Sequence, residues 1–294
     1  MMNQYRILTD SSVDLPSEVA NAIHIIVIPM KVMIDGNIYA NYLDGREIGF
    51  KEFYDVLRQG IMPSTSQLNP EEIIVVMEPL LSDGIDVLFL SFSSALSGTY
   101  QSAVFAQKQL QQKYPERKIV VMDSLCASMG QGLLVWQAAQ RQIAGMPMDE
   151  LVNWVDSNKL RVCHLFTIHD LDYLRKGGRL SAEKAFLGKL LGVKPILHVS
   201  LEGKLVQTGM ARGRRNAIRK LLDRMDETID TTQDPVVFLS HGDCEEDVAY
   251  VTDLVQERYP RVKIMSSFVG PVIGSHSGLH TLAIFYMGSD RYSK

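Results

Sequence analysis

The sequence has few cysteines and no long apolar stretch. Both features limit the kinds of protein that it can encode. Its 294 residues include 3 cysteines, Cys126, Cys163 and Cys244, which lie far apart and outside any Cys-x-x-Cys spacing. Neither a disulfide framework nor a zinc site is therefore predicted, and we expect buried free thiols. No run of about 18 uncharged apolar residues occurs, and the N-terminus lacks the basic, apolar and small-residue order of a signal peptide. We expect a cytoplasmic protein without stable membrane insertion.

The glycine-rich loops that bind nucleotides are also missing. No Gly-x-Gly-x-x-Gly follows the first predicted strand, and Gly-x-x-x-x-Gly-Lys-Ser/Thr occurs nowhere in the chain. Nucleotide binding by the standard loops is thus unsupported, and we expect neither a metal nor a cofactor. The length and the 46% hydrophobic content allow a large core and favour two domains.

Charge is distributed unevenly along the chain. The segment from Lys159 to Lys220 holds 14 Lys and Arg against 4 Asp and Glu, a balance of +10, whereas the whole chain carries -4. Nucleic acid would suit a basic region, but no aromatic-rich strand, helix-turn-helix or finger pattern accompanies it. A protein partner or a phosphate group fits better, and simple solvated helix faces are the alternative.

Short β-branched runs alternate with amphipathic segments. Strands are predicted at residues 5–8, 25–34, 87–92, 119–122, 162–168, 196–199, 236–239, 264–268 and 281–286. Helices are predicted from Pro70 behind an Asn69 cap and at residues 99–113, 127–143, 148–158, 214–225 and 245–258. The alternation predicts an α/β fold with a largely parallel sheet. Turns at Asp35-Gly36-Asn37 and Glu202-Gly203-Lys204 predict hairpins, the second inside a smaller mixed domain that begins near residue 160.

Polar loops follow two of the predicted strands. Thr9-Asp10-Ser11-Ser12 comes after the first, and a serine-rich loop from Ser91 to Thr99 leads into a helix. Hydroxyls and free N–H groups at the carboxyl ends of strands suit an anion, so phosphate or carboxylate is the expected guest. Alternatively, Ser97 only caps its helix.

A third segment, residues 269–278, places His276 among glycines and serines, and we expect a loop there. The histidine can point into a cavity, or it can simply be satisfied by a backbone carbonyl within a turn. A serine hydrolase is a further possibility, but the Gly-x-His-x-Gly pattern puts histidine at the elbow position where a serine nucleophile belongs.

The motifs taken together resemble the DegV family over essentially the whole chain. They are Thr9-Asp10-Ser11, Ser64-Thr65-Ser66-Gln67, Ser97-Gly98-Thr99-Tyr100, Asp123-Ser124, Arg175-Lys176-Gly177-Gly178-Arg179-Leu180-Ser181, Val193-Lys194-Pro195-Ile196-Leu197 and Gly274-Ser275-His276. The resemblance implies an α/β/α N-terminal domain, residues 1–160, and a smaller α/β domain with a mixed sheet, residues 161–294. The 269–280 loop is then expected to return to a lipid site between them.

The resemblance also implies a function and a set of site residues. A long-chain fatty acid such as palmitate, stearate or oleate is held in a buried tunnel and presented to a separate fatty acid kinase, which serves phospholipid synthesis. The carrier then holds the acyl phosphate and is not itself the catalyst. The carboxylate-binding residues carry over to Thr65, Ser97, Gly98 and His276, and Arg179 and Arg212 match head-group or kinase-facing positions.

Two other functions stay open on sequence alone: a small-molecule serine hydrolase, and a regulatory or nucleic-acid-binding protein. The basic region would dock the kinase in the carrier interpretation. Its candidate docking residues are Arg175, Lys176, Arg179, Arg212, Arg214 and Arg215.

Overall fold

The first part of the chain builds a parallel sheet. The computed structural model describes residues 5–169, 171–180, 192–232, 235–289 and 291. Four strands pair in the order β2-β1-β6-β7, and every pair is parallel. Their bounds are β1 Tyr5–Asp10, β2 Ile26–Ile28, β6 Asp86–Ser91 and β7 Ile119–Asp123. All four precede residue 160.

The second part builds a six-stranded mixed sheet in the order β10-β9-β8-β13-β11-β12. Only the β11–β12 pair is parallel; the others are antiparallel. The bounds are β8 Val162–Thr167, β9 Val193–Val199, β10 Leu205–Arg212, β11 Val236–His241, β12 Lys263–Phe268 and β13 Leu282–Met287. The predicted α/β class, with a mainly parallel sheet followed by a mixed one, is confirmed.

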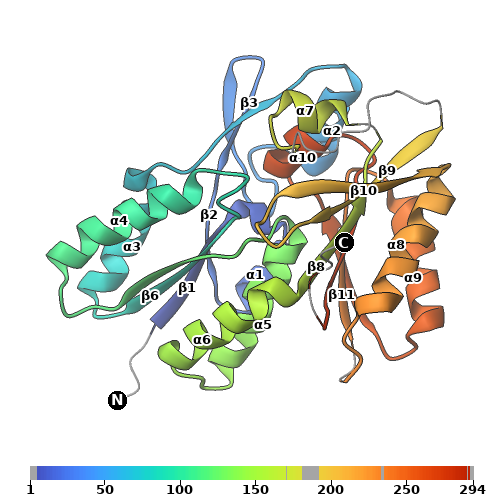
Figure 1. Cartoon of the computed structure of the whole chain (residues 1–294). Helices are drawn as coiled ribbons and strands as arrows, with labels where there is room; N and C mark the ends of the chain where they lie inside the picture. The colour runs from blue at the N-terminus through green and yellow to red at the C-terminus, as the bar shows by residue number, and fades with distance from the viewer. Residues whose placement is uncertain (1–4, 170, 181–191, 233–234, 290, 292–294) are drawn as a thin grey trace.

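The helices form layers around these sheets (Figure 1). Helices α3 and α4 cover the outer face of the parallel sheet, α8 and α9 cover the outer face of the mixed sheet, and α5 lies between the two sheets. The helix bounds are α1 Ser17–Ala22, α2 Phe50–Arg58, α3 Pro70–Ser82, α4 Thr99–Lys113, α5 Met129–Ile143, α6 Met148–Asn158, α7 Asp172–Lys176, α8 Arg214–Thr228, α9 Glu245–Arg258 and α10 Pro271–Ser277, with the 3-10 turns η1 Ser11–Val13 and η2 Lys159–Arg161. The core around α5 therefore joins both parts of the chain.

A small three-stranded sheet lies above the parallel sheet in the view of Figure 1, near α2, α7 and α10. Its order is β4-β3-β5, with bounds β3 Lys31–Ile34, β4 Asn37–Ala40 and β5 Ser64–Ser66. The predicted hairpin at Asp35-Gly36 is the antiparallel β3–β4 pair, and the one at Gly203 joins β9 to β10. Both turn predictions are confirmed.

Two sequence predictions are wrong. The expected strand at residues 25–34 is two strands, because Pro29 has no N–H to give to a ladder and the chain there leaves the parallel sheet for the small one. The expected loop around His276 is helix α10, which begins with Pro271 at its first position. Proline is well suited there, since its fixed φ fits the helix and its missing N–H would have no partner. Helix α2 and strand β5 were not predicted.

Other expectations concern the chain as a whole. All three cysteines are free and buried, as predicted. Among the described residues, no helix is long and apolar enough to cross a membrane, and no cluster of three or more His, Cys, Asp or Glu is placed to hold a metal. Ser181, the last residue of the basic Gly-Gly motif, lies outside the described residues.

Candidate functional site

A cavity lies between the two large sheets, where the parallel strands end and α5 begins. The space between its walls is about 790 Å³, including the part that opens to solvent. Most of its wall is apolar: Met30, Phe92, Leu96, Ala127, Phe166, Leu174, Val199, Leu205, Val269, Val272, Ile273, Ala283 and Phe285. The polar lining is Thr65, Gln67, Ser97, Ser128, His164, Arg179, Ser240, His276, Ser277 and Thr281. Such a space suits a ligand that is mainly apolar with a few polar atoms.

Thr65 and His276 meet at one end of this cavity. Thr65 pairs with the buried Val32 across the β3–β5 ladder, so its side chain lies on the inner face while its neighbour Ser64 faces solvent. Its Oγ1 lies 2.8 Å from Nε2 of His276, which comes from α10. Two of the residues that the sequence nominated for the site therefore lie in direct contact.

His276 is neutral at pH 7 and has an unused ring nitrogen. Burial, with a contribution from the nearby Arg179 charge, lowers its pKa to about 4. Its Nδ1 is buried and has no hydrogen-bond partner among the described residues. Gly177 lies so close to this nitrogen that a Cβ at that position would overlap it. Among the residues that the structure describes, no carboxylate bonds to the imidazole, and so they do not form the arrangement of a Ser-His-Asp triad around His276.

Ser97 reaches the same end of the cavity from the start of α4. Its Oγ lies 3.0 Å from Oγ1 of Thr99 and accepts a hydrogen bond from the Thr99 N–H at 3.2 Å. The serine thus supports the beginning of the helix and lines the cavity as well. Gly98 does not line the cavity; it is the N-cap residue, and it packs against Gln67 so closely that a Cβ would overlap the amide.

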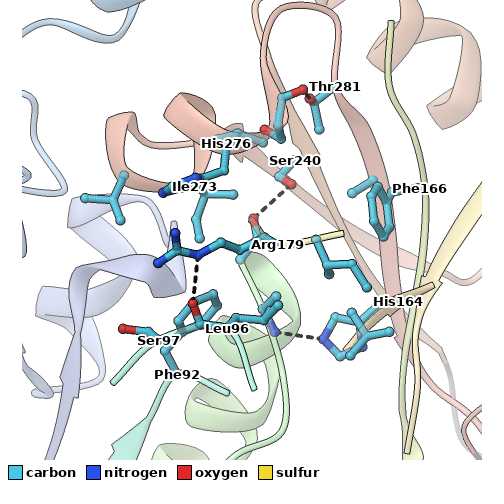
Figure 2. Close-up of a pocket in the computed structure, with 18 of the residues that line it drawn as sticks. Phe92, Leu96, Ser97, His164, Phe166, Arg179, Ser240, Ile273, His276 and Thr281 are labelled. Carbon is cyan, nitrogen blue, oxygen red and sulfur yellow. Dashed lines mark hydrogen bonds between the residues drawn. The ribbon is translucent and has the colours of Figure 1, made fainter. Parts of the chain in front are cut away.

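Arg179 brings a positive charge to this end (Figure 2). Its Nε donates to the Leu96 carbonyl at 3.0 Å and its Nη1 to the Gly177 carbonyl at 2.6 Å. Within the described part of the chain, Nη2 makes no hydrogen bond to another residue, so it can donate to a ligand. We name Thr65, Ser97, Arg179 and His276 the head-group end; its polar groups are donors, and its formal charge is positive.

Not every predicted site residue joins this cluster. Arg212, at the end of β10, is exposed and does not line the cavity; its carbonyl accepts from Nδ2 of Asn216. The Thr9–Ser12 segment does not line it either, because its polar groups bond internally: Asp10 Oδ2 accepts from the Phe92 N–H at 2.9 Å, and the Ser11 hydroxyl accepts from the Met30 N–H at 3.0 Å. That segment therefore supports the fold around the cavity.

Sequence reasoning missed a second polar group in the wall. Ser128 donates to Oδ2 of Asp14 at 2.6 Å and lies 3.2 Å from the Ser240 hydroxyl, while the Gly270 N–H donates to Oδ1 of the same aspartate. Burial raises the pKa of Asp14 to about 7. This network ties the starts of α5 and α10 together. Its one sequence signal was the density of serines, which does not reveal partners so far apart in the chain.

A mostly apolar cavity with a cationic end inside an α/β fold is the kind of site that suits a small amphipathic acid. A model described as "Uncharacterised protein, DegV family" matches residues 4–289. A DegV domain-containing protein of Clostridium perfringens is 40% identical over 290 residues, 99% of each chain. Another, from Caldanaerobacter subterraneus, is 34% identical over 97% of this chain and 99% of its own. The chain belongs to the DegV family, as its motifs predicted.

Solved structures show the same fold. A DegV family protein from Thermus thermophilus, described by its fatty acid binding, has a TM-score of 0.87 at 29% identity over 97% of this chain and 99% of its own. DegV of Bacillus subtilis, described as a fatty acid binding protein, has a TM-score of 0.85 at 29% identity over 98% and 100%. A stearic acid-binding protein from Eubacterium ventriosum has a TM-score of 0.87 at 25% identity over 97% and 98%.

Proposed function

We propose that this protein binds a long-chain fatty acid in the cavity, with the carboxylate at the head-group end. The observation that carries the proposal is the polarity of the cavity: hydroxyls, an imidazole and a guanidinium gather at one end, and the remaining wall is mainly apolar. The head-group residues are half-buried, whereas His164 and Phe285 are nearly fully buried. An ionised group would therefore lie toward solvent and a hydrocarbon chain away from it. The fatty-acid-binding relatives support this assignment.

The head-group end satisfies a carboxylate through a short relay. When Nε2 of His276 carries the ring proton, it donates to Thr65 Oγ1, and the threonine hydroxyl is then free to donate to the acid. Ser97 and Nη2 of Arg179 supply further donors. Burying a carboxylate is costly unless several donors replace its water, and charge-assisted hydrogen bonds are the strongest available.

The hydrocarbon tail supplies most of the affinity. Each buried methylene contributes roughly 0.8 kcal/mol, so a chain of palmitate, stearate or oleate length gains more than its head group does. The polar contacts then fix the direction in which the acid enters. In this arrangement the fatty acid is a ligand, and the protein is a carrier with no catalytic residue of its own.

The proposal includes a separate kinase that transfers a phosphoryl group to the presented carboxylate. The carrier then holds the acyl phosphate, whose extra negative charge is stabilised by the cationic Arg179 and by the hydrogen bond that His276 supports through Thr65. Replacing His276 by Gln should therefore slow acyl phosphate formation more than it weakens fatty-acid binding. Equal effects on both would mean that this side chain has no part in the transfer step.

The kinase would dock on part of the basic segment. Arg212 and Arg215 are exposed, and Arg215 lies over the Tyr250 ring at 5.0 Å. Arg214, by contrast, donates to Asp247 at 2.8 Å and is mostly buried. Of these three arginines, Arg212 and Arg215 have charges available to an acidic partner, and Arg175 and Lys176 of α7 are exposed as well.

Mass spectrometry of lipid extracted from the purified protein tests the binding step. We expect one long-chain fatty acid per protein molecule, and the delipidated protein should take up palmitate, stearate or oleate again. A protein that carries no lipid and binds none of these acids would refute the proposal. Hydrolysis of an ester by the isolated protein would favour a hydrolase, and salt-sensitive nucleic-acid binding would favour a regulatory role.

A further inference from the structure

His164 lies in the cavity wall with both ring nitrogens used by backbone groups. It belongs to β8 and is 2% exposed. Its Nε2 accepts a hydrogen bond from the Ala127 N–H at 3.1 Å, so Nδ1 carries the proton and donates to the Val162 carbonyl at 3.0 Å. The imidazole thus offers no free polar atom to a ligand, unlike that of His276.

Packing holds the same ring in place. Gly130, in the first turn of α5, lies so close to the imidazole that a Cβ there would overlap Nε2. The Phe285 ring meets it edge-on, with centroids 5.4 Å apart and planes at 86°. Burial, together with the nearby Arg291 charge, lowers the pKa of His164 well below its usual value, so the ring is neutral. The cavity therefore meets an uncharged, flat and fixed surface here.

Figure 2 shows where this surface lies: His164 and Phe166 are on the side of the cavity away from Ser97 and His276. We propose that His164 closes the far end of the cavity and so limits the length of the acyl chain that fits, a proposal that rests on the fatty-acid binding inferred above. The expected ligand is a fatty acid whose methyl end contacts the imidazole face.

A fixed imidazole limits chain length better than an aliphatic side chain would. A leucine or methionine at this place could rotate to admit a longer tail. His164 can rotate only by leaving the Ala127 N–H and the Val162 carbonyl unpaired in a buried region, which is unfavourable. Each additional methylene of a chain that is too long would meet this resistance.

Variants at His164 and Gly130 should move the length preference in opposite directions. His164→Ala removes the ring and makes room for about two more methylenes, and each methylene that becomes buried strengthens binding about four-fold. Gly130→Ala pushes the imidazole toward the cavity and should favour shorter acids. His164→Gln keeps an acceptor for the Ala127 N–H and most of the bulk, so its preference should stay close to that of the unchanged protein. Met77→Ala, a core change outside the cavity lining, is the matched control.

The measurement is the affinity of each delipidated protein for saturated acids of increasing length. The optimum should shift to longer acids in His164→Ala, shift to shorter acids in Gly130→Ala, and stay unchanged in Met77→Ala. If His164→Ala does not fold, the Gly130→Ala result decides the question. Unchanged optima in whichever of these two variants fold would overturn the role of His164 while leaving fatty-acid binding intact. An unchanged protein that binds none of the acids would instead overturn the proposed function, and this inference with it.

Discussion

The two ends of the cavity each contain a histidine, and the two histidines are used differently. His276 shares a hydrogen bond with the Thr65 hydroxyl, and its Nδ1 has no partner among the described residues. His164 has both nitrogens bonded to backbone groups. Burial makes both rings neutral at pH 7. A side chain with spare hydrogen-bonding capacity can serve a ligand, whereas one whose capacity is used by the backbone serves the shape of the cavity.

The same contrast holds for the arginines behind each end. Arg179 has two bonds to carbonyls and an Nη2 that can reach a ligand. Arg291 is 1% exposed and donates to the carbonyls of Val162, Leu125, Lys159 and Ser200, as well as to Sγ of Cys126. Replacing Arg291 should therefore mainly affect stability, whereas variants at the head-group end should mainly affect binding.

The largest expected effect is the loss of stability on replacing Arg291. Arg291→Met removes the hydrogen bonds of a buried guanidinium to four carbonyls, and hydrogen bonds to a charged group are worth about 1.5 to 3 kcal/mol each. We expect the free energy of unfolding to fall by about 3 kcal/mol or more, measured by urea denaturation at pH 7. Arg46→Met, which removes an exposed ion pair with Asp44, should have a far smaller effect, because solvent screens that pair. A similar small loss in both variants would show that Arg291 is not a structural residue of the far end.

At the head-group end, the hydroxyls should matter for binding. Thr65→Val and Ser97→Ala each remove a donor to a charged carboxylate, and we expect each to weaken fatty-acid binding by about 1.5 to 3 kcal/mol. Titration calorimetry on delipidated protein would measure this. Ser64→Ala is the control, because Ser64 is on the exposed face of the same strand. Losses of equal size for Ser64 and Thr65 would argue against a specific carboxylate site.

A third prediction concerns acid stability through His276. Its folded-state pKa of about 4 lies below the usual 6.5, so the unfolded chain binds the proton more readily and stability falls as pH drops from about 6.5 to 4. The His276→Gln variant has no imidazole to protonate, so it does not lose stability in this way. The difference in unfolding free energy between the two proteins should change by on the order of 1 to 2 kcal/mol over this range. Asp14, whose raised pKa acts in the opposite direction, is common to both proteins and cancels in the comparison. A difference that does not vary with pH would show that His276 does not titrate as described.

The smallest expected effect concerns the proposed kinase. Reversing the charge of Arg212 and Arg215 should slow its association roughly 3- to 10-fold at low salt, with folding and bound lipid unchanged. Stopped-flow mixing at two salt concentrations measures this rate. An unchanged association rate at low salt would show that these two arginines are solvated surface residues with no part in docking.

Much of the fold was predictable because local chemistry specifies it. Helix α4 has the predicted bounds Thr99–Lys113, and the Asn69 capping box begins α3 where the sequence placed it. Helix α10 was missed, since its Gly and Ser residues favour turns and only its packing against the rest of the protein makes it a helix. The strained backbone at Leu125 and Ser128, with φ of 52° and 51°, is also invisible in the sequence.

The sequence by itself determined the α/β class and the family, because motif and periodicity are local properties of the chain. The family resemblance then nominated the site candidates Thr65, Ser97, Gly98, His276, Arg179 and Arg212. Only the tertiary structure decided how these residues are used. It joined Thr65 to His276 across 211 positions and left Arg212 outside the cavity. It also placed His164 between Ala127 and Val162. Hydrogen-bond partners and cavity walls depend on distances between segments that no local pattern encodes.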